Sequence, residues 1–206
     1  MSNLKKNDQD EYTILNIPYA QYIKGDLDFA KNIVIDNRNS IAFHIGGGIA
    51  IPYGNARMIP FEKRYFSGGA NSVRGWSVRS LGPGTFSDEK GNFMNQSGDI
   101  KLDASIEYRT RLFWKFRGAL FVDAGNIWTI REYQDQPGGK FKFDQFYKQI
   151  AVAYGVGLRL DLDFFVLRFD GGMKTINPEQ GKDRYPILRS DFGRDFAFHF
   201  AVGYPF

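Results

Sequence analysis

Residues 99–112 read DIKLDASIEYRTRL, and the alternation within this stretch decides the class of fold. The even positions are uncharged and mostly apolar, whereas six of the seven odd positions carry a charge. A repeat of two residues is that of a β-strand with one apolar and one polar face. Strands of soluble proteins usually have about 5–6 residues. The length therefore favours a strand that crosses a bilayer at a tilt, for which ~9–11 residues suffice.

Six other segments repeat this alternation, and together they predict an antiparallel all-β fold. We expect the apolar face of each segment to contact lipid and the charged, small-residue face to line a wet lumen. In this view the lipid-facing Leu158 should not tolerate arginine, whereas the lumenal Arg159 should tolerate leucine. Tyr12–Ile17 is a candidate for a short eighth strand. The six segments are Tyr22–Phe29, Ser40–Ile51, Arg117–Trp128, Gln149–Asp161, Phe164–Met173 and Phe196–Phe206.

The connections between these segments are of two kinds. Residues 36–39, 113–116 and 161–164 form tight connections, whereas 52–98, 129–148 and 174–194 form long ones. Short turns at one end and long loops at the other are typical of transmembrane β-barrels in outer membranes. A soluble β-barrel such as a lipocalin, whose apolar face points inward, is the alternative. The long strands and the charged small-residue face disfavour it.

The composition of the 206 residues excludes several classes of protein. No apolar run approaches the ~18 residues that a membrane-spanning helix needs. The absence of cysteine excludes disulfides, thiolate metal ligands and cysteine nucleophiles. The net charge of +4 comes from interspersed charges, so nucleic-acid binding is not indicated. The two histidines, His44 and His199, lie on small-residue faces and are expected to be bystanders. We therefore predict no catalytic residue, no metal site and no cofactor.

The longest connection, residues 52–98, is called the motif loop below. Its middle, from 60 to 86, reads PFEKRYFSGGANSVRGWSVRSLGPGTF and holds more apolar residues than a solvated loop usually does. Its glycines permit positive φ and close backbone approach. We therefore expect the loop to fold back and pack against the inside of the barrel. There Arg74 could extend its guanidinium to a carboxylate. The plainer interpretation of Arg74 is a solvated loop arginine.

Five short motifs resemble those of the BamA/TamA family of outer-membrane assembly barrels, also called bacterial surface antigens. They are SVRGW (72–76), SIEYR (105–109), FVDAGNIW (121–128), GVGLRLD (155–161) and the ending GYPF (203–206). The resemblance covers the chain from about Tyr19 onward. Trp76 stands where the family usually has Phe or Tyr. The sequence of residues 60–76 is also similar to that of TamA-like lipoprotein relatives from Bacteroidetes.

The resemblance implies roles for individual residues. Arg74 matches the motif arginine, and Asp123 and Glu107 match the lumenal carboxylates that receive it. Both carboxylates also lie on the charged faces that alternation assigns to the lumen, although a plain lumen-lining role is the alternative for Asp123. Tyr204 and Phe206 resemble the terminal aromatic signal that assembly machinery reads, and aromatic residues are also common on lipid-facing strands. The rest of the implied motif consists of Gly68, Gly69, Gly75 and Trp76.

The resemblance further implies a protein of the bacterial outer membrane that inserts β-barrel proteins or exports proteins without a chemical reaction. Its implied partners are lipid, unfolded client outer-membrane proteins, upstream POTRA domains and assembly partners. We interpret residues 1–18 as a polar segment and 19–206 as the C-terminal half of the barrel, with further strands upstream. A passive pore is the alternative function. A barrel lipase or protease is a third, which lacks a nucleophile with a base near it in the sequence.

Overall fold

The computed structural model describes residues 5–6, 11–15, 17–88, 94–188 and 191–206. The main feature is an antiparallel sheet of seven strands in the order β10-β9-β8-β7-β6-β5-β4, so each strand pairs with its neighbours in the sequence. This confirms the predicted all-β antiparallel fold. The strands are β4 (Gln21–Val34), β5 (Asn39–Tyr53), β6 (Ile100–Arg111), β7 (Phe116–Trp128), β8 (Ala151–Asp161), β9 (Val166–Ile176) and β10 (Phe196–Val202).

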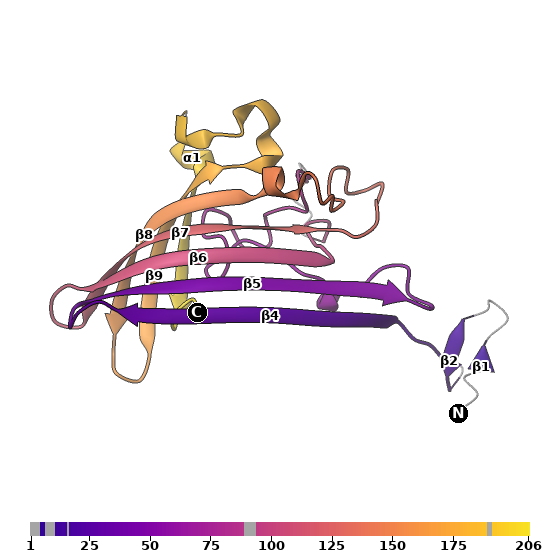
Figure 1. Ribbon diagram of the computed structural model, residues 1–206, viewed down its shortest axis with the longest axis horizontal. Helices are drawn as coiled ribbons and strands as arrows, with labels where there is room; N and C mark the ends of the chain where they lie inside the picture. Colours follow the sequence, from indigo (N-terminus) through magenta and orange to yellow (C-terminus); the bar gives the residue numbers. More distant parts are fainter. Residues whose placement is uncertain (1–4, 7–10, 16, 89–93, 189–190) are drawn as a thin grey trace.

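A second, small sheet corrects the prediction of an eighth barrel strand near Tyr12–Ile17. It consists of β1 (Lys5–Lys6), β2 (Tyr12–Ile14) and β3 (Ile17–Pro18), which pair with one another and, among the described residues, with no strand of the larger sheet. Leu15 has a positive φ of 52°, which favours a turn, so the chain folds back locally instead of extending beside β4. The small sheet lies beyond the end of the long strands (Figure 1). Asn55 holds it there, because its side chain bonds the backbone N–H and C=O of Tyr12 at 2.8 and 2.7 Å.

The tight turns and the long loops lie at opposite ends of the seven-stranded sheet, as predicted (Figure 1). The helices are short and lie in the long loops. They are η1 (Phe61–Lys63), η2 (Phe146–Gln149), η3 (Pro178–Asp183), η4 (Pro186–Leu188) and α1 (Phe192–Asp195). Within the described ranges, no helix is long and apolar enough to cross a membrane.

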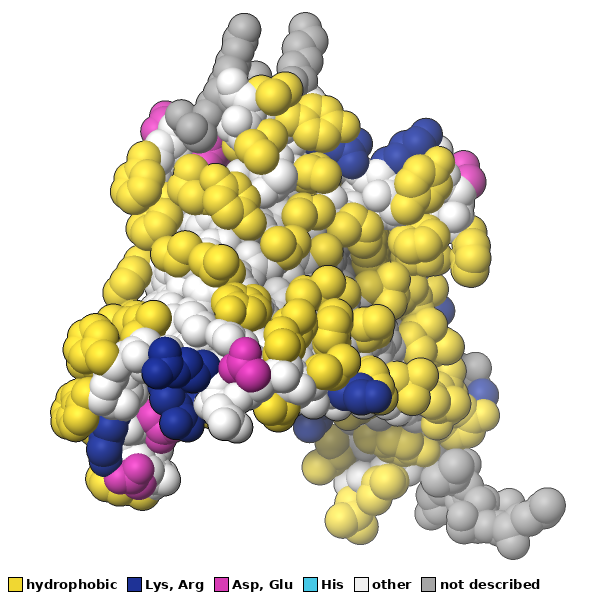
Figure 2. All heavy atoms as spheres, turned by 60° about the vertical axis from the view of Figure 1, so that its left-hand side comes forward, with side chains coloured by type: hydrophobic (Ala, Val, Ile, Leu, Met, Phe, Trp, Pro, Cys, Tyr) yellow, Lys and Arg dark blue, Asp and Glu magenta, His cyan; other side chains and the backbone are white. Residues whose placement is uncertain are grey.

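The two faces of the sheet differ in chemistry as the alternation predicts. On β8, the outward-pointing Tyr154, Val156 and Leu158 are 40–62% exposed, whereas Ala151 and Ala153 are fully buried. Figure 2 shows apolar side chains spread over the middle of this side of the molecule, with most of the charged side chains in its upper and lower parts. An apolar surface of this extent on a sheet suits contact with lipid. Other exposed apolar residues of this face are Leu27, Ile45, Ile106, Leu120, Phe198 and Phe200.

The last strand ends earlier than predicted. β10 stops at Val202, and Gly203 has a φ of 89°, a left-handed conformation that glycine adopts readily. The chain thus turns away from the outer face. The Phe206 ring stacks on His44 with 5.1 Å between ring centres, and the Tyr204 ring centre lies 4.6 Å from the Arg109 guanidinium. The prediction that residues 204 and 206 continue the lipid-facing row is therefore wrong.

The core lies between the concave face of the sheet and the motif loop, of which residues 52–88 and 94–98 are described. In one cluster, Val73, Trp76 and Leu81 of the loop pack with Ala151 and Ala153 of β8, all fully or almost fully buried. A second cluster joins Ile59 and Tyr65 of the loop to Ala50 of β5 and Ile127 of β7. The loop therefore folds back onto the sheet, as predicted.

Candidate functional site

Glycines and one buried aromatic side chain set the path of the motif loop around Arg74. Gly68 and Gly69 have φ values of 92° and 95°, which residues with a Cβ rarely adopt. The N–H of Gly69 donates to the C=O of Trp76 at 2.8 Å and closes this part of the loop. Gly75 permits close contact with β8, because a Cβ at this position would lie 2.6 Å from the Cβ of Ala153. These features present Arg74 to the concave face.

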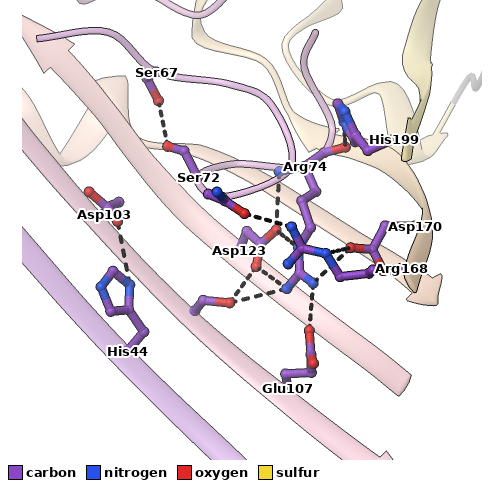
Figure 3. A network of polar contacts seen from close by, with 12 residues as sticks. His44, Ser67, Ser72, Arg74, Asp103, Glu107, Asp123, Arg168, Asp170 and His199 are labelled. Atoms are coloured by element: carbon purple, nitrogen blue, oxygen red, sulfur yellow. Dashed lines mark hydrogen bonds and ion pairs between the residues drawn. The ribbon is translucent and has the colours of Figure 1, made fainter. Parts of the chain in front are cut away.

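The Arg74 guanidinium is fully buried and donates to both predicted acceptors (Figure 3). Its Nε and Nη2 donate to the two carboxylate oxygens of Asp123 at 2.7 and 2.8 Å, and its Nη1 donates to Glu107 Oε2 at 2.5 Å. The backbone N–H of Arg74 also donates to Asp123, at 3.1 Å. The ring of Phe121 lies under the guanidinium, 3.5 Å from its centre. We call Arg74 with Asp123 and Glu107 the Arg74 latch.

Further charged residues extend the latch into a network. Arg159 of β8 donates from Nη1 to Asp170 Oδ1 of β9 at 2.5 Å and from Nη2 to Glu107 Oε2 at 3.0 Å. The Nε of Arg168 lies 3.4 Å from Asp170 Oδ2. Three guanidinium groups thus face three carboxylates, each at most 1% exposed: Arg74, Arg159 and Arg168 against Glu107, Asp123 and Asp170. Burying a charge costs several kcal/mol unless an opposite charge and hydrogen bonds offset it. The equal numbers meet the charge part of that condition, whereas Arg159 Nε and Arg168 Nε and Nη1 are buried without a hydrogen-bond partner among the described residues.

The network revises one expectation from the sequence. The sequence predicts that Arg159, as a lumenal residue, tolerates leucine, but Arg159 is fully buried and bridges Glu107 and Asp170. Sequence reasoning also missed Asp170 as a member of the site. The signal was present in part, since Asp170 lies on the polar face of its predicted strand. Strand register, which places Gly157 opposite Asp170 and Arg159 opposite Arg168, was needed to bring these side chains together.

The two histidines lie beside the network. His199 of β10 makes a 3.0 Å hydrogen bond through Nε2 to the C=O of Arg74 (Figure 3). The contact is close because β9 has glycine at 172, where a Cβ would lie 2.2 Å from that carbonyl oxygen. His44 of β5 lies 2.8 Å from Asp28 and 3.5 Å from Asp103. Among the residues that the structure describes, no group of three or more His, Cys, Asp or Glu side chains is arranged to hold a metal ion.

Two further contacts hold the motif loop on either side of Arg74. The hydroxyl of Tyr65 donates to Asp26 of β4 at 2.7 Å. The N–H of Gly82 donates to the carboxylate of Glu179 in η3 at 3.2 Å. Burial raises the pKa of the Glu179 carboxyl to about 7, although the Gly82 N–H and the charge of Lys174 each lower it. The loop is therefore attached to the edge strand β4 and to η3, between β9 and β10, as well as to the central strands.

The fold and the site define one wall of a transmembrane β-barrel with a loop folded against its lumenal face. Residues 11–206 match the model of the Omp85 superfamily domain, and the chain belongs to this superfamily. Its location is accordingly an outer membrane. The superfamily confirms the predicted resemblance to BamA/TamA barrels, whereas the closer likeness to TamA-like lipoproteins of Bacteroidetes stays a prediction.

Individual relatives agree with this membership. Outer membrane protein assembly factor BamA of Neisseria meningitidis serogroup B is 29% identical over 183 residues, which cover 79% of this chain and 21% of that protein. The human sorting and assembly machinery component 50 homolog is 28% identical over 160 residues, covering 72% and 33%. The crystal structure of BamA from Haemophilus ducreyi lacking POTRA domains 1–3 superposes with a TM-score of 0.62 at 21% identity, covering 89% and 35%. The chain thus spans between a fifth and about a third of these relatives' lengths.

Proposed function

We propose that this chain is part of a barrel that assists the insertion of β-barrel proteins into an outer membrane, or the export of proteins across it, without a chemical reaction. The observation that carries the proposal is the Arg74 latch, in which a loop arginine is fully buried among carboxylates of two neighbouring strands. Membership of the Omp85 superfamily supports it, as do relatives whose names describe outer membrane protein assembly and sorting and assembly machinery.

The proposed mechanism is mechanical. The latch and the network around it keep the loop and the strands β6 to β9 rigid. The neighbouring strand β10 pairs with β9 on one side only within the described residues, so its other edge carries backbone groups that a client strand could pair with. A rigid wall beside such an edge would hold the template still while the client strand adds to it. Residues Arg74, Gly75, Trp76, Gly68 and Gly69 hold the loop, with Asp123 and Glu107 as acceptors.

The partners in this proposal are lipid, unfolded client outer-membrane proteins, upstream POTRA domains and assembly partners. The outward apolar side chains support the lipid contact. The POTRA domains in the name of the Haemophilus ducreyi structure support the proposal of such domains upstream. Tyr204 and Phe206 act as a terminal signal in this proposal, and in this structure their rings face inward.

A liposome experiment separates assembly from a passive pore. The intact protein and its Arg74→Ala variant would be reconstituted, and both the insertion of an unfolded client barrel and the flux of a small solute would be measured. The proposal expects client insertion above that of empty liposomes, and a large loss of it in the variant. Solute flux without any client insertion would overturn the proposal in favour of the pore.

A further inference from the structure

The last four residues, Gly203–Phe206, lie in a place that the proposed function does not explain. We call them the aromatic tail. In the sheet order three strands lie between β10 and β6 and four between β10 and β5, yet the tail contacts residues of both β5 and β6. The Arg109 guanidinium of β6 lies 4.6 Å from the centre of the Tyr204 ring and 5.4 Å from that of Phe206. On β5, the His44 ring is stacked on Phe206 with an angle of 16° between the ring planes.

The residues that receive the tail are held in position by other partners. Arg109 donates from Nε to Glu107 Oε1 at 2.8 Å, and only 13% of its side chain is exposed. His44 is held by Asp28 through Nε2 at 2.8 Å. In the described part of the chain, Arg109 Nη2 is buried without a hydrogen-bond partner. A buried guanidinium N–H without an acceptor is unfavourable, and an oxygen from a ligand would relieve it.

We infer that Arg109 and His44 form a binding site for two aromatic residues of an extended chain, and that the protein's own tail fills it in this structure. This inference rests on the proposed function, because the competing ligand would be an aromatic strand of a client barrel. Side chains two residues apart in an extended chain point to the same side, so both rings can reach one guanidinium. Aromatic faces attract a desolvated guanidinium, whereas aliphatic side chains do not. The tail itself leaves Arg109 Nη2 without an acceptor, so a peptide that also places a backbone carbonyl there would gain a hydrogen bond.

The site is also connected to the Arg74 latch. The Glu107 carboxylate accepts from Arg109 through Oε1 and from Arg74 through Oε2. A client that displaces the tail would therefore change the surroundings of Arg109. Arg109 pairs with the same carboxylate, Glu107, as Arg74 of the motif loop. The pivot of this exchange is Gly203, whose φ of 89° turns the tail inward.

The test uses the intact protein in detergent micelles with a labelled, C-terminally amidated peptide of the sequence AVGYPF. Tyr204→Leu with Phe206→Leu empties the site while leaving β10 unchanged. Fluorescence anisotropy should give at least tenfold tighter binding to this double variant than to the wild type. A peptide with both rings replaced by leucine should bind at least tenfold more weakly. Adding Arg109→Met should remove the difference between the peptides, whereas Arg111→Met, the next lumenal position on β6, should not.

Two results would overturn the inference. One is equal binding of the aromatic and leucine peptides to the emptied variant. The other is aromatic binding that Arg109→Met leaves unchanged. The liposome assay keeps the two proposals apart. A protein that inserts clients without preferring the aromatic peptide contradicts only the binding site, and one that prefers the peptide but inserts no client contradicts only the proposed function.

Discussion

Arg74 presents a planar fork of N–H donors. The carboxylates on the concave face are matched to the geometry of this fork as well as to its charge. Two parallel bonds reach Asp123 and a third reaches Glu107, which a lysine ammonium cannot reproduce because it is a point charge on a flexible stem. The resemblance to a known motif implied the pairing of Arg74 with Asp123 and Glu107, and alternation separately placed both carboxylates on polar faces without singling them out.

We expect Arg74→Lys to restore part of the function that Arg74→Ala loses. The lysine keeps the positive charge between the two carboxylates, but it cannot bond both oxygens of Asp123 and Glu107 together. Client insertion by the intact protein measures this, with the mobility of a spin label on the exposed Ser77 as the readout of loop attachment. Equal activity of the lysine variant and the wild type would contradict a role for the forked geometry.

We expect Arg159→Leu to be strongly destabilising. Removing one partner of a buried charge network leaves the others uncompensated, which typically costs about 3–5 kcal/mol. Arg117→Leu is the matched control, because Arg117 also pairs with a carboxylate, Asp161, but its side chain is 37% exposed. For an exposed pair the loss should be at most about 1 kcal/mol. Denaturant unfolding of the intact protein in micelles checks both, and equal small losses would show that the network is not desolvated.

At the scale of elements, strands were predictable where the period of two is unbroken and less so at their ends. β6 and β7 begin or end within one residue of the sequence prediction. β10 stops at Val202, four residues before the predicted end, because Gly203 adopts a left-handed conformation. Alternation alone cannot distinguish such a glycine from a glycine within a strand. The charge network was missed for a related reason. Alternation assigns a face to Asp170 and Arg159, but only register and curvature decide which side chains meet.

The face assignment of β8 gives a prediction about lipid contact. Val156→Arg, in the middle of β8, should destabilise the protein in bilayers by about 2–4 kcal/mol if the residue lies near the midplane, because lipid cannot solvate the charge. Leu112→Arg is the control, since Leu112 is also exposed but lies beside a tight turn, where the cost falls to about 0–1 kcal/mol. Folding titrations into liposomes measure the difference. A larger loss at position 112 would reverse the assigned depth.

Glu179 gives the contact between η3 and the motif loop a pH dependence. Its pKa is about 7 when the contact is formed, against an ordinary 4.5, so the formed state retains a proton that the open state loses. The stabilisation of the formed contact by the protonated Glu179 is therefore fully present below about pH 4.5. It decreases as the pH rises to about 7 and is constant above that pH. The spin label on Ser77 should become more mobile across this window. Glu179→Gln, which has no titrating proton, should abolish the change, and an unchanged pH response in that variant would exclude Glu179 as its source.

At the scale of the whole molecule, the seven-stranded sheet is open. Within the described residues, β4 and β10 each pair on one side only, so two rows of backbone groups lack strand partners. Lipid cannot satisfy such groups. Residues 1–206 expressed alone should therefore associate or remain sensitive to protease in micelles. A monodisperse, heat-modifiable monomer with protected edge amides would show instead that this segment closes by itself.

The most direct test of the proposed mechanism is a double-mutant cycle between Arg74 and Asp123, with client insertion into liposomes as the readout. Because the two side chains form one buried unit, Arg74→Ala and Asp123→Ala should impair insertion to a similar extent, and the double variant should be no worse than either single variant. Losses that add in the double variant would contradict the Arg74 latch, because they would mean that the two residues act independently.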